Sequence, residues 1–170
     1  MLFRSFNNTN GGSETTPLFG AVIDMGGATN RRRPVFLAEQ LTNTAILPTM
    51  ITTTLTGANP TWNQPRSAND SIQLNGAHEL QTFAFSDGGN NRSLIMINLS
   101  RTAALPVTFS GANAPTGTIA VGQLTSANLT DTNETTGTVD ITNSTLTNFK
   151  PTTQYSLPPF SLTVFTWVTQ

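Results

Sequence analysis

Residues 162–168 have the sequence Leu-Thr-Val-Phe-Thr-Trp-Val, and this run decides the fold class of the chain. Threonine, valine and aromatic residues favour extended backbone. Successive side chains of a strand point to opposite faces of its sheet, and here both sets contain large apolar groups. A strand that is apolar on both faces must be covered on both. The run therefore predicts a central strand of a packed sheet.

Short polar side chains dominate the remaining composition. The 170 residues include 31 threonines, 17 asparagines and 12 serines, with 13 glycines and 10 prolines. Threonine favours strands and the other four favour turns, so the chain is expected to form many short strands with the turn spacing of a β-sandwich. The predicted strands are residues 51–55, 80–86, 93–99, 106–109, 118–124, 137–141 and 160–168, and a shorter one near residue 155.

Several classes of function are excluded or disfavoured by charge and residue type. A net charge of −1 gives no electrostatic footprint for nucleic acid or for an anionic membrane. No apolar run approaches the roughly 20 residues of a membrane helix. The chain has no cysteine and a single histidine, His78, without carboxylates spaced to complete a metal site. We therefore expect no metal and no cofactor.

One helix is predicted, at about residues 33–47. Pro34 suits the first helical position and Pro48 ends the run. Ala38, Leu41 and Ala45 form an apolar stripe, but no second helical pattern offers itself as a partner. We interpret residues 1–50 as the end of a larger barrel, with a disordered start, and residues 51–170 as a sandwich. A chain beginning near residue 51 should then be more soluble than the full chain, because the exposed stripe is lost.

A family resemblance is carried mainly by residues 156–167, Ser-Leu-Pro-Pro-Phe-Ser-Leu-Thr-Val-Phe-Thr-Trp. Together with the helix beginning Arg33-Pro34-Val35 and the hairpin that ends at residues 92–99, this segment resembles the end of clan A glycoside hydrolases of the arabinofuranosidase, xylosidase and glucuronidase-like families. In those enzymes a β/α barrel finishes with its last helix and is followed by a β-sandwich. The resemblance implies a mainly β fold, an antiparallel β-sandwich preceded by one α-helix that is a remnant of the barrel.

The resemblance also implies a function. The chain is expected to be the non-catalytic C-terminal accessory sandwich of a secreted bacterial enzyme, extracellular or periplasmic, and a fragment whose partner is the catalytic barrel. Retaining glycosidases use two carboxylates about 5–5.5 Å apart, and the resemblance puts both on earlier barrel strands. No residue of this chain is thus predicted to be catalytic. Asp87, in a glycine-rich hairpin turn, is interpreted as a turn former.

Trp62 is the candidate for contact with polysaccharide. Aromatic rings stack on sugars, and the neighbouring Asn59 and Asn63 could hydrogen-bond to hydroxyl groups. The alternative is that Trp62 packs between the barrel remnant and the sandwich. Two other functions stay open for the whole chain: an independent carbohydrate-binding module, and a Thr/Asn-rich bacterial surface or adhesin domain.

Overall fold

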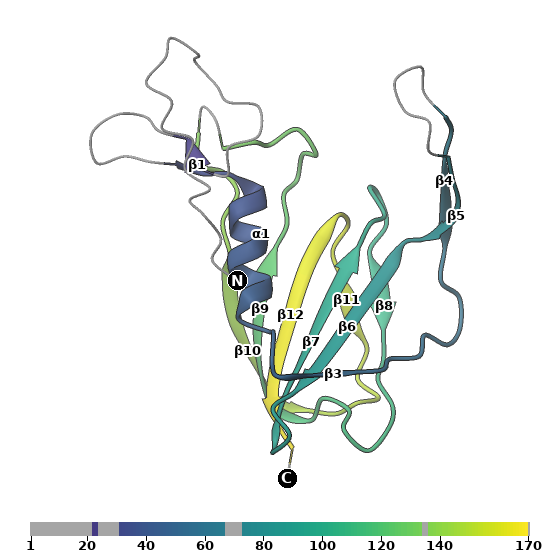
Figure 1. Ribbon diagram of the computed structural model, residues 1–170, viewed down its shortest axis with the longest axis vertical. Coiled ribbons are helices and arrows are strands. Elements are labelled where there is room, and N and C mark those ends of the chain that lie inside the picture. Colours follow the sequence, from purple (N-terminus) through teal and green to yellow (C-terminus); the bar gives the residue numbers. More distant parts are fainter. Residues whose placement is uncertain (1–21, 24–30, 67–72, 134–135, 170) are drawn as a thin grey trace.

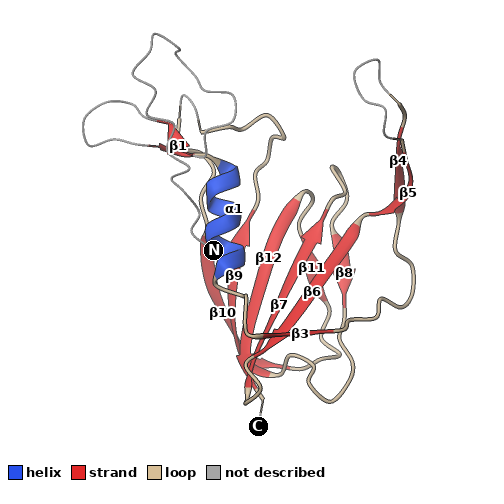
Figure 2. Ribbon diagram, viewed as in Figure 1, coloured by secondary structure: helices blue, strands red, loops and turns tan. Residues whose placement is uncertain are grey.

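A computed structural model of the chain describes residues 22–23, 31–66, 73–133 and 136–169. Within these ranges the protein is mainly β, with one helix and antiparallel sheets (Figure 1 and Figure 2). This confirms the predicted class of an antiparallel β-sandwich with one preceding α-helix. The predicted disordered start, at residues 1–21 and 24–30, lies outside the described residues.

The largest sheet has six strands, and every neighbouring pair in it is antiparallel. In spatial order the strands are β10 (Thr142–Phe149), β9 (Gly117–Leu124), β12 (Ser161–Val168), β7 (Asn91–Asn98), β6 (Leu80–Ser86) and β3 (Thr49–Ile51). Three two-stranded sheets accompany it: β1 (Val22–Ile23) with β2 (Arg31–Arg32), β4 (Thr61–Gln64) with β5 (Leu74–His78), and β8 (Leu105–Val107) with β11 (Tyr155–Leu157).

Strand β12 occupies the centre of the large sheet, as its sequence predicts. It pairs with β7 on one side and β9 on the other. Leu162 and Val164 face one apolar core, whereas Phe165 and Trp167 face a second core on the opposite side. The alternation of side chains along one strand thus builds both cores, and all four of these residues are buried.

The two cores lie on the two faces of the large sheet. The first joins the sheet to β8 and β11, and its buried members are Ala84, Leu94, Met96, Leu105, Ile119, Val121, Phe149, Leu157, Phe165 and Trp167. The second joins the sheet to the helix, and its buried members are Leu37, Leu41, Ala45, Ile95, Leu124, Val139, Leu162 and Val164. The fold is therefore a sheet covered by strands on one face and by the helix on the other.

Helix α1 (Pro34–Asn43) begins where the sequence predicts but ends earlier than residue 47. Pro34 occupies the first turn, where its missing N–H removes no helical hydrogen bond. At the other end the Thr44 hydroxyl and amide both donate to the carbonyl of Leu41, and the Ala45 amide donates to the carbonyl of Thr42. These tighter bonds replace the helical pattern, so the chain leaves the helix well before Pro48.

The helix is not left without a partner, which corrects the interpretation that its cover is missing. Leu37, Leu41 and Ala45 are 2%, 4% and 0% exposed, buried against β9, β12 and neighbouring residues of this chain. The sequence contains no second helical pattern as a partner, because the partner is a sheet face that forms from residues far along the chain. The division at residue 50 stays a prediction, although β3, in the large sheet, spans that position.

The predicted strand at residues 137–141 is wrong, and the edge strand β10 follows it instead. Val139 is buried, but its amide and carbonyl are both hydrogen-bonded to the side-chain amide of Asn133 rather than to another strand. Asn133 adopts a left-handed φ of 62° and also donates to the carbonyl of Arg32. One buried amide side chain therefore fastens this loop both to itself and to β2.

Candidate functional site

The predicted polysaccharide-contact residues lie on or beside the β4–β5 hairpin. The hairpin extends away from the large sheet (Figure 1). Trp62 pairs with Ala77 across it, and the register shifts between Trp62 and Gln64. The structure thus places Trp62 and Asn63 on one projecting strand, with Asn59 just before it.

The two asparagines serve the backbone of the hairpin. The Asn59 side chain accepts from the Leu80 amide at 3.2 Å and donates to the Leu80 carbonyl at 3.4 Å. Asn63 accepts from the Gly76 amide at 2.7 Å. The predicted sugar-contact side chains thus bind the protein's own backbone. Both polar atoms of Asn59 and the oxygen of Asn63 are used in this way, and these bonds stabilise the hairpin.

Trp62 itself is half-buried, and its indole Nε1 is buried without a hydrogen-bond partner. A buried indole N–H normally donates to an acceptor, so Trp62 Nε1 is an unsatisfied hydrogen-bond donor. The side-chain nitrogen of Asn63, an exposed residue next to Trp62, has no hydrogen-bond partner within the described residues. Contact of these three residues with polysaccharide stays a prediction.

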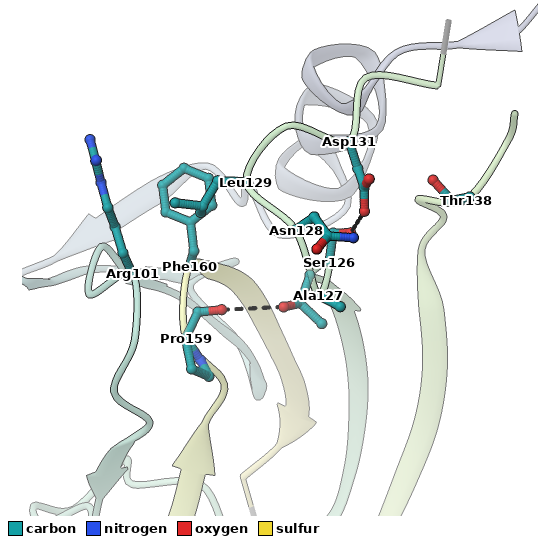
Figure 3. A pocket seen from close by; sticks show the side chains of 10 residues that line it. Arg101, Ser126, Ala127, Asn128, Leu129, Asp131, Thr138, Pro159 and Phe160 are labelled. Carbon is teal, nitrogen blue, oxygen red and sulfur yellow. Dashed lines mark hydrogen bonds between the residues drawn. The ribbon is translucent and has the colours of Figure 1, made fainter. Parts of the chain in front are cut away.

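A groove that the sequence did not predict lies at the start of β12. It has a volume of about 690 Å³, and exposed Phe160 and Leu129 line it together with polar side chains (Figure 3). The polar members are Arg101, Thr125, Ser126, Asn128, Asp131 and Thr138. Two other grooves, beside α1 and near the end of β12, have similar volumes but no exposed aromatic ring in their walls.

Phe160 is fixed by its neighbours although its ring is exposed. Its φ is 45°, and its amide donates to the carbonyl of Ser100 at 2.7 Å. The two carbonyls before it are also held, since that of Pro158 accepts from Ser161 Oγ at 2.7 Å and that of Pro159 from Thr125 Oγ1 at 3.3 Å. The turn that carries the ring is therefore rigidly connected to the sheet.

Backbone hydrogen bonds connect the hairpin base to the same end of the sheet. The Glu79 amide donates to the Pro60 carbonyl, and the Leu99 amide donates to the Glu79 carbonyl, both at 2.8 Å. The next residue along, Ser100, accepts the Phe160 amide. The segments bearing Trp62 and Phe160 therefore belong to one continuous network.

Five of the nine acidic residues of the chain lie within the described ranges. Those described are Glu39, Glu79, Asp87, Asp131 and Asp140. No group of three or more histidine or acidic side chains there lies close enough to hold a metal ion. Nor does any described helix have the length and apolar character needed to cross a membrane.

Asp87 acts as a turn former, in agreement with the sequence interpretation. Its carboxylate accepts from the Gly89 amide at 2.8 Å and from both the backbone and the side chain of Asn91. The Asn91 side-chain bond, followed by the two amides, holds the pKa of Asp87 below its usual value although burial opposes this. The hydrogen bonds favour the charged form, and they stabilise the β6–β7 turn.

No family profile and no curated protein matches this sequence. Solved structures do match its fold. The chain is similar to the thermostable GH51 α-L-arabinofuranosidase from Thermotoga petrophila RKU-1, with a TM-score of 0.73 and 22% identity over 88% of this chain and 31% of that one. It is similarly related to an α-L-arabinofuranosidase from Thermotoga maritima, solved as an arabinose complex, with a TM-score of 0.72 and 22% identity over 88% and 32%.

This chain has the fold of about a third of an arabinofuranosidase. The likeness in fold covers 88% of this chain, although the sequence comparisons found no match. It confirms at the level of fold the resemblance to clan A enzymes noticed in residues 156–167.

Proposed function

We propose that this chain is the non-catalytic C-terminal accessory region of a polysaccharide-degrading glycoside hydrolase, where it packs against a catalytic β/α barrel and stabilises it. The observation that supports this most is unequal coverage: the shared fold takes up 88% of this chain but 31% of the arabinofuranosidase. The remaining two-thirds of such an enzyme leaves room for a barrel. The Leu-Pro-Pro-Phe-Ser segment supports a position at the C-terminal end.

The outer side of α1 is the best candidate for the barrel contact. Val35 and Ile46 are exposed on or just after the helix, while Leu37 and Leu41 occupy its inner side. Met50, on edge strand β3, is also exposed. Exposed apolar side chains, and an edge strand with no further partner strand within the described residues, are typical of surfaces that another part of a protein covers.

The chemistry of the parent enzyme would come from the barrel. We infer a retaining glycosidase, whose two carboxylates are supplied outside this chain. The substrate would be a polysaccharide, and the enzyme would act outside the cytoplasm. A composition with one lysine and abundant threonine and asparagine supports an exported protein.

The coding sequence upstream of Met1 gives the sharpest test of this proposal. An in-frame β/α barrel with two candidate catalytic glutamates would support it. A stop codon followed by a ribosome-binding site directly before Met1 would contradict it. That second outcome would favour the surface or adhesin domain.

A joined protein of barrel and chain tests the proposed contact directly. Val35→Asp with Ile46→Asp should lower the thermal unfolding temperature of the barrel, because charges would replace apolar contacts. Leu74→Asp is the matched control, since Leu74 is an exposed apolar residue on the projecting hairpin. Equal barrel stability in all three proteins would refute the α1 contact.

A further inference from the structure

Phe160 combines an unfavourable backbone conformation with an exposed aromatic ring. Its backbone has a left-handed φ of 45°, and its ring is 48% exposed. Non-glycine residues avoid this region because the Cβ crowds the backbone. Strain of this kind persists where the surroundings enforce it, and it concentrates at binding and active sites. The strained backbone points an apolar ring toward solvent and gains no core packing from it.

The surroundings of Phe160 hold the ring in advance of any ligand. Below the turn, fully buried Asn98 places its side-chain nitrogen 2.8 Å from the Pro158 carbonyl and 3.2 Å from that of Leu157. The Asn98 oxygen accepts from the Ser100 amide at 2.9 Å, and Ser100 in turn accepts from Phe160. A site whose supporting groups are fixed loses less conformational entropy on binding.

The groove presents the two kinds of surface that a sugar requires. A sugar ring has faces of C–H groups and a rim of hydroxyl groups. Phe160 and Leu129 give an apolar wall, with Arg101 on one side of it and Asn128 and Asp131 on the other, so that donors and acceptors flank the wall (Figure 3). The electron-rich face of an aromatic ring attracts polarised C–H groups. A volume of about 690 Å³ is in the range of small-ligand sites.

We propose that the Phe160 groove binds a neutral oligosaccharide, with one sugar ring stacked on Phe160 and its hydroxyl groups bonded to Arg101 and Asp131. The inference goes beyond the accessory role, since stabilising a barrel requires no contact with sugar. It places a polysaccharide surface at the turn before β12, apart from the predicted contact residues Trp62, Asn59 and Asn63 of the hairpin region.

The charges of the groove favour a neutral ligand. It contains one cation, Arg101, and one anion, Asp131. Within the described part of the chain, no hydrogen bond or ion pair engages the Arg101 guanidinium. Asp131 is held by a hydrogen bond from Ser126 Oγ and has acceptor capacity left. The carboxylate of a uronate would be attracted by Arg101 but repelled by Asp131. Neutral hydroxyl groups can instead accept a hydrogen bond from Arg101 and donate one to Asp131.

Titration calorimetry on the full chain tests the proposal with neutral xylo-, arabino- and gluco-oligosaccharides of about six sugars. Saturable binding is expected for at least one series, and Phe160→Ala should weaken it by about tenfold or more, as truncation of a central aromatic anchor does. Phe83→Ala is the matched control, because Phe83 is an exposed phenylalanine on β6. It should leave the affinity unchanged, and thermal unfolding should show both variants folded.

Three outcomes would overturn the inference. One is the absence of binding to every neutral series up to about 10 mM, a concentration about tenfold above a dissociation constant of about 1 mM. Another is binding that survives Phe160→Ala or is lost in Trp62→Ala alone. The third is binding confined to uronate oligosaccharides. None of these outcomes depends on a barrel. If the oligosaccharide experiment fails, the accessory role is still tested separately by the thermal unfolding of the protein that joins the barrel to this chain.

Discussion

Leu41 of α1 lies directly over Gly122 of β9. A Cβ built on Gly122 would come within 2.5 Å of Leu41 Cδ1, so an alanine at this position would force the buried Leu41 side chain to shift. We expect Gly122→Ala to lower the free energy of unfolding by about 1–3 kcal/mol, the usual cost of overpacking a core. Urea unfolding followed by circular dichroism would measure it.

Gly137→Ala is the control for that substitution. Nothing lies within 4 Å of the position its Cβ would take, and its φ is not left-handed. Alanine should therefore be neutral or stabilise the protein by a few tenths of a kcal/mol to about 1 kcal/mol, through the unfolded chain. If Leu41→Ala and Gly122→Ala together cost as much as the sum of the two single changes, the close contact is not the cause.

Removing residues 1–50 should make the protein less soluble, the opposite of the sequence-based expectation. Leu37, Leu41 and Ala45 fill one core, and their loss would expose the facing side chains Ile95 and Val164. We expect the shortened chain, residues 51–170, to bind a hydrophobic dye and to unfold without a sharp transition. Residues 31–170, which keep α1 and β3, should behave better than residues 51–170. Equal solubility of these two shortened chains would count against α1 as a structural layer.

The strands of the core could be predicted because their own residues specify them. Strand β6 matches the predicted residues 80–86, and β12 nearly matches its prediction. In both, β-branched and aromatic side chains agree with burial on a sheet, and in β12 apolar groups on both faces agree with its central place. The edge strand β10 escaped prediction because its sequence, Thr-Asn-Ser-Thr-Leu-Thr-Asn-Phe, is mostly polar and exposed. β10 forms by pairing with β9, a tertiary contact that the strand propensity of its own residues does not specify.

The candidate site was harder to predict, because it depends on which polar atoms are already used. Asn59 and Asn63 attract attention beside Trp62, yet they bond to backbone at Leu80 and Gly76. Those partners are known only once the hairpin has formed. Phe160 was not predicted as a site residue because it belongs to the motif that specifies the last strand, and it was counted as the first residue of that strand. Its proline pair was the available signal, since two prolines just before a strand indicate a fixed turn.

Asn98 should be among the least replaceable polar residues. It is 0% exposed, with its nitrogen facing the carbonyls of Ala103, Leu157 and Pro158. Asn98→Asp would set carboxylate oxygens against those carbonyls, and we expect a loss of at least about 3 kcal/mol in urea unfolding. Asn143→Asp, on an exposed position of β10, should change stability by less than about 0.5 kcal/mol. Similar losses in both variants would show that the buried network contributes little.

Tyr155 offers a pH test that reports on one residue, because the chain has a single tyrosine. Burial raises the pKa of its phenol above the ordinary value of 10, and a hydrogen bond from Gln123 opposes the shift only in part. Its ring meets that of Phe165 edge-on, with centroids 4.8 Å apart, which keeps water from one side.

Tyrosinate absorbance should therefore rise at a higher pH in the folded protein than in urea, where the midpoint returns to about 10. Since the folded pKa is the higher one, the neutral phenol stabilises the fold fully below pH 10, and this contribution is lost as the pH rises through the folded pKa. Tyr155→Phe cannot ionise, so its unfolding free energy should fall less steeply above pH 10 than that of the parent protein. Identical midpoints in the folded and unfolded states would mean that Tyr155 is hydrated, and that the core beside β11 is looser than its packing indicates.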